Sequence, residues 1–372
     1  MTQYIYQHPA WPNFQWNKTE IDLLLNEVLV SMGYLRGLVV GLGFKEQQQG
    51  QVAAIAQEIT QSFSIEGLKL NPSEVRSSIA HKLGFPELVT VKRPSANIDG
   101  ITQVALDGIN HADAPLTQER LFSWYQWLFA GIQHDIDVGK YRADRYGPMQ
   151  VVSGMMGNEK VHYQAPPSAQ VPAMMHALLD FINQSPEHHI LKAAVAHLWM
   201  VTIHPFDDGN GRLARAISEL LLARVDASLK RFYSMSEAIL RQRKAYYSSL
   251  ENAQSGTMDI SAWMRWFLLC LQDALNRAAE TMQTVIRKYQ LLHQFSGQLN
   301  ERQKKMIDRL MTGFKGNLTS AKWAKINKVS QMTANRDIAE LITLKILVSV
   351  DRGPHTHYVL TPTFASDAFS QN

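Results

Sequence analysis

Apolar residues recur at helical spacing along most of this chain. Between residues 21 and 63 they lie three or four positions apart, as Leu25, Val28 and Met32 do, and Gly43 separates two helices. Further helices are predicted over residues 72–82, 118–130, 171–183, 189–201, 210–223, 235–252 and 260–289. The pattern therefore predicts a mainly α fold.

One stretch breaks the helical pattern. Residues 149–153 and 159–163 are strand-like, and the segment between them contains Gly154, Gly157 and Asn158. Two short strands joined by such turn residues are typical of a β-hairpin.

The pattern starts again after residue 297, where the composition becomes more basic. Helices are predicted over 301–311, 320–326 and 330–344, followed by two strands over 347–350 and 357–360. Helices followed by a short hairpin are typical of a winged helix-turn-helix, so we place a domain boundary at about residue 298.

Composition narrows the class of protein. Of 372 residues, 45% are hydrophobic and 19% are charged, as in folded globular proteins, and the net charge of +4 permits an acidic partner without requiring one. The single cysteine, Cys270, excludes an internal disulfide and suits a reducing compartment. The longest apolar stretches seen, 35–44 and 193–203, fall short of the ~20 residues that span a bilayer. We expect a cytoplasmic protein without membrane contact.

The candidate chemistry lies in residues 204–215, His-Pro-Phe-Asp-Asp-Gly-Asn-Gly-Arg-Leu-Ala-Arg. The preceding helix is almost wholly apolar, so it should be buried and deliver His204 from the interior. A glycine-bearing loop then opens the next helix, and backbone amides at such a place bind anions. Arg212 and Arg215 share one helical face, where two guanidinium groups can grip phosphate oxygens.

Two further residues complete a site for phosphoryl chemistry. Asp208 is placed to hold a magnesium ion that bridges phosphate oxygens, and His204 can accept a proton from an incoming hydroxyl. Separately, a histidine after an apolar helix is usually a core residue and a Gly-Asn-Gly is usually a turn. Their occurrence together favours a nucleotide-transfer site.

Residues 204–215 resemble the signature of the Fic family without departure. The resemblance implies a helical core in which His204 deprotonates a Ser, Thr or Tyr hydroxyl of a protein target, and this hydroxyl attacks the α-phosphate of ATP. It also implies that Asp208 binds Mg²⁺. Phosphate or nucleotide contacts are expected from Phe206, Asp207, Gly209, Asn210, Gly211, Arg212 and Arg215. Because Gly211 typically differs in relatives that act as kinases, transfer of AMP is favoured over phosphorylation.

Two peripheral features extend the resemblance. The hairpin looks like the family's flap, which pairs with an extended target segment as an added strand. Its candidate docking residues are Val151, Val152, Val161 and His162, although a purely structural hairpin is the alternative. Tyr246 and Tyr247 fall in a stretch near the adenine site, but they could equally be core residues. Gln254 departs from the family's usual asparagine there.

Residues 62–67, Ser-Phe-Ser-Ile-Glu-Gly, resemble the family's inhibitory motif. The resemblance implies that Glu66 binds Arg215 and so competes with the γ-phosphate, with Ser62 and Gly67 completing the motif. A helix end capped by Gly67 is the alternative. Whether Glu66 also drives removal of AMP is open. The expected organisation is an N-terminal helical arm (1–113), a Fic core (114–297) and a winged helix (298–372).

A DNA-binding regulator is the competing function, in which the Fic core uses another nucleotide or mainly modifies itself. Residues 333–341 have the residue pattern of the second helix in a helix-turn-helix. The candidate phosphate contacts are Lys322, Lys325, Lys328, Arg336, Arg352, His355 and His357. Docking of a protein onto residues 298–372 is the alternative, and a homodimer stays open.

Overall fold

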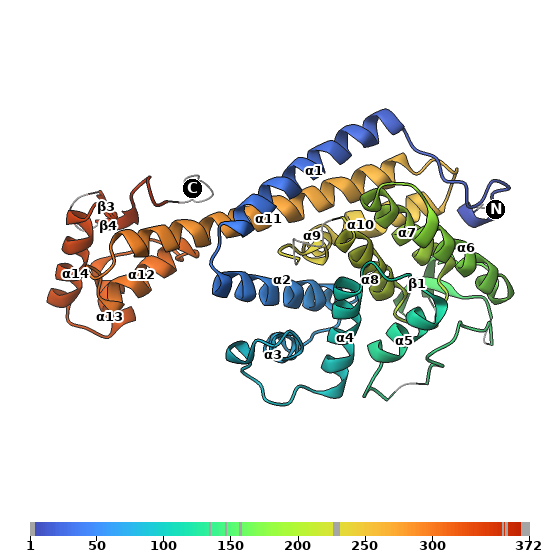
Figure 1. Ribbon diagram of the computed structural model, residues 1–372, viewed down its shortest axis with the longest axis horizontal. Coiled ribbons are helices and arrows are strands. Elements are labelled where there is room, and N and C mark those ends of the chain that lie inside the picture. The colour runs from blue at the N-terminus through green and yellow to red at the C-terminus, as the bar shows by residue number, and fades with distance from the viewer. Residues whose placement is uncertain are drawn as a thin grey trace. The chain divides into compact units, whose positions relative to one another are not determined.

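The computed structural model is mainly helical, as predicted (Figure 1). It describes residues 4–133, 135–145, 147–155, 158–225, 231–351, 353 and 356–365. The chain forms two compact units, residues 1–278 and 279–372, which we describe separately. The units meet inside the long helix α11 (Ser261–Gln294), whereas the sequence-based boundary at 298 lies after that helix.

The first unit opens with two helices on either side of Gly43. Asn17 caps α1 (Lys18–Val40) by accepting the amide of Glu20, and Gly43 is the N-cap of α2 (Phe44–Ile65). The predicted break is therefore confirmed. The apolar row of α1 lies in the core, and it consists of Ile21, Leu25, Val28, Met32, Leu35 and Val39.

Helix α1 also corrects one observation made from the sequence. By length and composition it could cross a membrane, with a mean hydropathy of 1.5 over its most apolar window. The stretches 35–44 and 193–203 were therefore not the longest apolar ones, because scattered polar residues such as Glu27 concealed this one. A mostly buried core helix of a soluble protein and a signal sequence near the N-terminus pass the same test, and 22% of this window is buried. Cytoplasmic localisation stays a prediction.

The remaining helices of this unit follow the predicted order with two differences. Helix α4 was not predicted, and the helix expected over 235–252 is divided at Gln242. The elements are α3 (Pro72–Lys82), α4 (Ala96–Asn110), α5 (Gln118–Leu128), α6 (Val171–Gln184), α7 (His189–Ile203), α8 (Asn210–Ala223), α9 (Met235–Arg241) and α10 (Arg243–Gln254), with short 3₁₀ turns at Ile5–Gln7, Pro86–Leu88 and Ser168–Gln170.

Helix α7 lies at the centre of the unit. Every residue from 190 to 203 is buried, as its nearly continuous apolar sequence predicts, and α8 and α6 pack against it. The indole of Trp263 on α11 donates a hydrogen bond to the Ala194 carbonyl at 2.8 Å. Because α7 is enclosed in this way, the position of the backbone at His204, the residue that follows it, is fixed.

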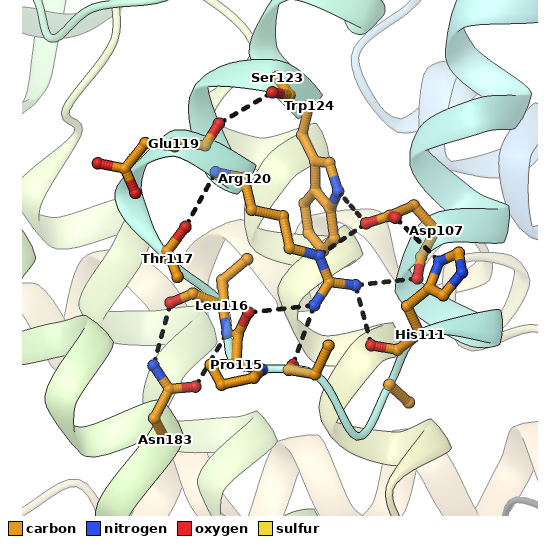
Figure 2. A network of polar contacts seen from close by, with 12 residues as sticks. Asp107, His111, Pro115, Leu116, Thr117, Glu119, Arg120, Ser123, Trp124 and Asn183 are labelled. Carbon is orange, nitrogen blue, oxygen red and sulfur yellow. Dashed lines mark hydrogen bonds and ion pairs between the residues drawn. The ribbon is translucent and has the colours of Figure 1, made fainter.

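A polar network joins α4 to α5 (Figure 2). Arg120 and Trp124 both donate to one carboxylate oxygen of Asp107, at 2.7 and 2.6 Å. The same guanidinium also donates to backbone carbonyls of the connecting loop, including that of His111 at 3.0 Å. Although burial alone would raise it, these hydrogen bonds hold the pKa of Asp107 below its ordinary value. The network fixes α4 on the edge of the core.

The predicted hairpin is present as β1 (Gln150–Met155) and β2 (Asn158–Gln164). The strands pair antiparallel, with Val151 opposite Tyr163 and Val152 opposite Val161, and the register shifts between the two pairs. Val151, Val152 and Val161 are exposed, while Tyr163 is buried. The hairpin therefore rests on the core through Tyr163 and offers apolar side chains to solvent.

The second unit contains α12 (Glu301–Met311), α13 (Ser320–Asn327), α14 (Gln331–Thr343), β3 (Leu347–Val350) and β4 (His357–Leu360). These elements lie where the sequence predicted them. Its apolar core includes Trp323, and the buried carboxylate of Asp337 accepts hydrogen bonds from Arg302 at 2.7 and 2.8 Å. That this unit is a winged helix stays a prediction.

Candidate functional site

His204 occupies a left-handed backbone conformation at the end of α7. Its φ and ψ are 51° and 57°, and its amide donates to the Met200 carbonyl at 3.0 Å. This conformation is uncommon for residues other than glycine and costs free energy. The surrounding structure must therefore hold His204 in place.

Arg142, which sequence reasoning missed, supplies that support. Its side chain is wholly buried, and its Nε donates to the His204 carbonyl at 2.7 Å. Its own amide donates to the Pro205 carbonyl at 2.9 Å. The remaining guanidinium nitrogens bind Asp144 and the Pro166 carbonyl, at 2.5 and 2.6 Å. Arg142 comes from an irregular loop without a motif, so no sequence signal marked it.

The imidazole of His204 is held in one orientation. Its Nδ1 lies 3.3 Å from the Val201 carbonyl oxygen, and only a protonated nitrogen can make this contact. The other nitrogen, Nε2, is then the proton acceptor. Burial lowers the pKa of His204 to about 4, so the ring is neutral at pH 7. These are the properties of an available general base.

The loop after His204 is closed by Asn210. The Asn210 side chain accepts the Phe206 amide at 3.0 Å and donates to the Phe206 carbonyl at 2.8 Å. Phe206 itself is buried and stacks on Tyr125 with ring centroids 4.2 Å apart. In this structure both residues shape the loop, and their expected phosphate contacts stay predictions.

Gly209 makes the turn into α8 possible. Its φ is +80°, and a Cβ there would lie 2.9 Å from a methyl carbon of Leu128. Asp208 precedes it with 61% of its side chain exposed, and this carboxylate accepts the Gly209 amide at 2.6 Å. The neighbouring Asp207 has its pKa raised, chiefly by burial. Both carboxylates of the loop are exposed, and Asp208 is the one that binds the Gly209 amide and Arg212.

Arg212 is packed between two aromatic rings. Its guanidinium lies 5.1 Å from the Phe63 ring and 5.0 Å from the Phe129 ring, and it donates to Asp208 at 2.9 Å. Its buried Nε has no hydrogen-bond partner in the structure. Arg212 therefore has donor capacity beside the loop.

Arg215 is almost completely buried and is bound by the end of α2. Its side chain is 3% exposed; Nε donates to the Ser62 hydroxyl at 2.8 Å and Nη2 donates to Glu66 at 2.7 Å. Nη2 also donates to the Ser62 carbonyl at 3.0 Å. The structure thus brings Ser62, Glu66 and Arg215 together, as the resemblance led us to expect.

Two glycines allow Glu66 to reach this position. A Cβ on Gly211 would lie 2.5 Å from a carboxylate oxygen of Glu66, so a larger residue there would collide with it. Gly67 has φ +81°, and the amide of Leu68 donates back to the Phe63 carbonyl, which ends α2. Gly67 therefore ends α2 directly after Glu66, the residue that binds Arg215.

The two tyrosines of α10 differ in position. Tyr246 is 1% exposed and its hydroxyl lies 2.9 Å from Nε2 of His197. It is therefore a core residue in this structure, which was the alternative interpretation of the sequence. Tyr247 is 40% exposed, and its hydroxyl donates to the Ile65 carbonyl at 3.3 Å and to Glu66 at 3.4 Å. Tyr247 therefore contacts the inhibitory segment.

His162 of the hairpin lies beside α10. Its Nδ1 is 3.5 Å from a carboxylate oxygen of Glu251. Among the described residues, no group of three or more His, Cys, Asp or Glu side chains is arranged to hold a metal ion. A metal would therefore have Asp208 as its protein ligand and take its other ligands from phosphates and water, as Mg²⁺ commonly does.

The site combines a buried helix, a histidine in a left-handed backbone conformation and a glycine-containing loop at the start of α8. In a comparison with known families, residues 115–222 match the Fic/DOC family. This stretch of the chain is thus similar to Fic domains. Residues 4–85 match a domain of unknown function, DUF4172.

Curated relatives carry the name "Protein adenylyltransferase Fic". The protein from Nematostella vectensis is 26% identical over 230 residues, which are 60% of this chain and 48% of the relative. The protein from Drosophila willistoni is 32% identical over 114 residues, which are 30% and 21% of the two chains. The chain thus spans half or less of these relatives.

Solved structures agree on the fold. A Fic family protein from Desulfovibrio desulfuricans G20 matches with a TM-score of 0.55 and 21% identity, over 92% of this chain and 96% of its own. A Fic domain containing signaling protein from Bacteroides thetaiotaomicron VPI-5482 matches with a TM-score of 0.50 and 19% identity, over 69% and 97%. At these identities the likeness concerns the fold alone.

The role of Arg142 leads to a stability prediction. Arg142→Ala leaves the His204 and Pro166 carbonyls without their donors and Asp144 without its cation. We expect it to lower the free energy of unfolding by about 3 kcal/mol, because these partners are mostly buried. Urea unfolding measures this loss. Arg145→Ala is the matched control, since Arg145 is exposed and should change stability by about 0.5 kcal/mol or less. Equal effects of the two substitutions would contradict the role.

Proposed function

We propose that the chain transfers AMP from ATP to a hydroxyl of a protein target, and that Glu66 holds this activity down. The observation that carries the proposal is the ion pair between Glu66 and Arg215 beside a neutral, oriented His204. The names of the relatives support transfer of an adenylyl group.

The reaction assigns one task to each group. The oxygen of a Ser, Thr or Tyr hydroxyl attacks the α-phosphorus of ATP, its proton passes to Nε2 of His204, and the bond to the bridging oxygen breaks to release pyrophosphate. At the start of α8 the amide of Gly211 holds a phosphate oxygen, and the amide of Gly209 can do so once Asp208 releases it. Arg212 and Arg215 bind the distal phosphates. A magnesium ion on Asp208 would neutralise phosphate charge.

Autoinhibition follows from competition for one guanidinium. Arg215 already uses Nε and Nη2 on Ser62 and Glu66, and only its buried Nη1 is without a hydrogen bond. A γ-phosphate that approaches Arg215 meets the negative charge of Glu66 within contact distance. ATP must then bind with its phosphates displaced, which prevents the in-line attack.

Removing the carboxylate tests the inhibition. Glu66→Gly should raise the rate of label transfer from α-labelled ATP to protein by tenfold or more, because Arg215 is freed for the γ-phosphate. The measurement is incorporation into the chain itself and into lysate proteins, with the modified residue mapped by mass spectrometry. His204→Ala in the same background is the control and should abolish transfer. If the Glu66→Gly variant transfers label at the same rate as the wild-type chain, inhibition by this residue is refuted.

The lowered pKa of His204 predicts the pH dependence. Because the base must be neutral and its pKa is about 4, the neutral form persists as the pH falls from 8 to 5. Single-turnover transfer by the Glu66→Gly variant should therefore show no loss from histidine protonation between pH 8 and pH 6. A half-maximal rate near pH 6.5 would mean that His204 titrates like an ordinary histidine.

DNA binding by the second unit is a second candidate function. The first two turns of α14 expose Gln331, Met332, Asn335 and Arg336, side chains of the kinds that read base edges and bind phosphates. The buried acidic residue of this helix, Asp337, is neutralised by Arg302. Of the other expected contacts, His357 lies 3.7 Å from Asp351, whereas Arg352 and His355 lie outside the described residues.

Binding to a mixed-sequence DNA duplex tests this candidate. We expect the full chain to bind with an affinity that falls as salt rises from 50 to 200 mM, because phosphate contacts release counterions. Lys325→Ala should reduce the slope of log affinity against log salt by about 1, as measured by fluorescence anisotropy. Lys304→Ala is the control, since Lys304 pairs with Glu301 on α12. Absence of binding at 50 mM salt would eliminate DNA as a partner.

A further inference from the structure

The aromatic N-terminal segment, residues 4–16, is anchored along its whole length. Ile5 is completely buried in the short 3₁₀ turn. Trp11 and Phe14 pack edge-to-face on Trp199 of α7, with ring centroids 5.9 and 5.4 Å away. Gln15 accepts the Ile260 amide at 2.8 Å through its carbonyl, next to the start of α11. We call this segment the strap.

Tyr4 and Tyr6 of the strap pack against Tyr163 of the hairpin. Tyr4 and Tyr6 stack on each other at 5.9 Å, and both meet the edge of Tyr163, at 5.0 and 6.3 Å. Three aromatic rings in such geometry stabilise one another beyond the area that they bury. Tyr163 is only 2% exposed as a result.

Tyr163 connects the hairpin to the catalytic helix. It lies in β2 opposite Val151, and its hydroxyl donates to the Thr202 carbonyl at 2.7 Å. Thr202 precedes His204 by two residues on the same helix. The strap therefore packs against Tyr163, the residue through which β2 is hydrogen-bonded to the end of α7.

The strap belongs to the same matched region as the inhibitory helix. The match to DUF4172 covers residues 4–85, which begin at Tyr4 and include Glu66. One end of this region holds the hairpin through Tyr4 and Tyr6, and the other holds Arg215 through Ser62 and Glu66. The region thus contacts the hairpin, where the target is expected to bind, and Arg215, where the nucleotide is expected to bind.

We propose that the strap is the positioning element of the target-docking flap: Tyr4 and Tyr6 hold Tyr163 so that β2 keeps the place at which a target segment pairs. This inference rests on the proposed function, because it assigns a partner to the hairpin. It gives the matched domain two separable roles, control of the nucleotide side by Glu66 and support of the target side by the strap.

Hydrogen exchange of the full chain tests the support directly and requires no catalytic activity. In the Tyr4→Ala/Tyr6→Ala double variant, the amides of residues 160–164 should exchange at least tenfold faster, while those of α8 stay protected. The Tyr4→Phe/Tyr6→Phe variant keeps the rings and should restore slow exchange. Unchanged exchange at 160–164 in the alanine variant would overturn the proposal, and so would equal loss of protection in α8, because the strap would then support the whole unit.

A second measurement separates the two sides of the site. In the Glu66→Gly background, the alanine variant should bind ATP with unchanged affinity by calorimetry but label protein at least fivefold more slowly, and the phenylalanine variant should recover the rate. Weaker ATP binding would contradict a role confined to the target side. If Glu66→Gly itself transfers no label while the exchange result holds, the proposed reaction fails and the mechanical support of β2 stands.

Discussion

The buried guanidinium of Arg215 is the constraint on which the rest of the site depends. A cation at 3% exposure is unstable unless anionic or strongly polar groups surround it. Ser62 and Glu66, from a helix about 150 positions earlier in sequence, provide them. In the proposed function, the contact that stabilises the protein is also the one that would exclude a γ-phosphate. Activity and stability would then compete for one side chain.

This competition explains why small residues surround the contact. Gly211 leaves room for the Glu66 carboxylate, and Gly67 adopts the left-handed conformation that turns the chain away after Glu66. The same two positions serve different states. Gly211 offers its amide to phosphate in the proposed reaction, and its lack of a side chain makes space for the Glu66 carboxylate in this structure.

Much of this could be read from the sequence because the signals are local. The bounds of α3, α8 and α12 follow from capping residues and apolar spacing, and the 204–215 loop has its own motif. What could not be read depends on distant partners. Helix α4 carries Gly100 and Gly108, which weaken a helix by propensity, yet Gly100 is needed because a Cβ would lie 2.2 Å from the Trp127 carbonyl. Arg142 comes within reach of His204 only once the chain has folded.

The attachment of α2 limits how the proposed inhibition could be relieved. Near the middle of the helix, the buried carboxylate of Glu58 accepts hydrogen bonds from the Ser234 hydroxyl at 2.8 Å and the Ser236 amide at 2.9 Å, at the start of α9. Moving α2 as a rigid body would leave this carboxylate buried and unpaired, at a cost of several kcal/mol. Glu66 lies beyond the last helical turn and its side chain is 31% exposed. Rotation of Glu66 about its own side-chain bonds, with α2 still attached to α9, is therefore the movement of lowest cost that frees Arg215.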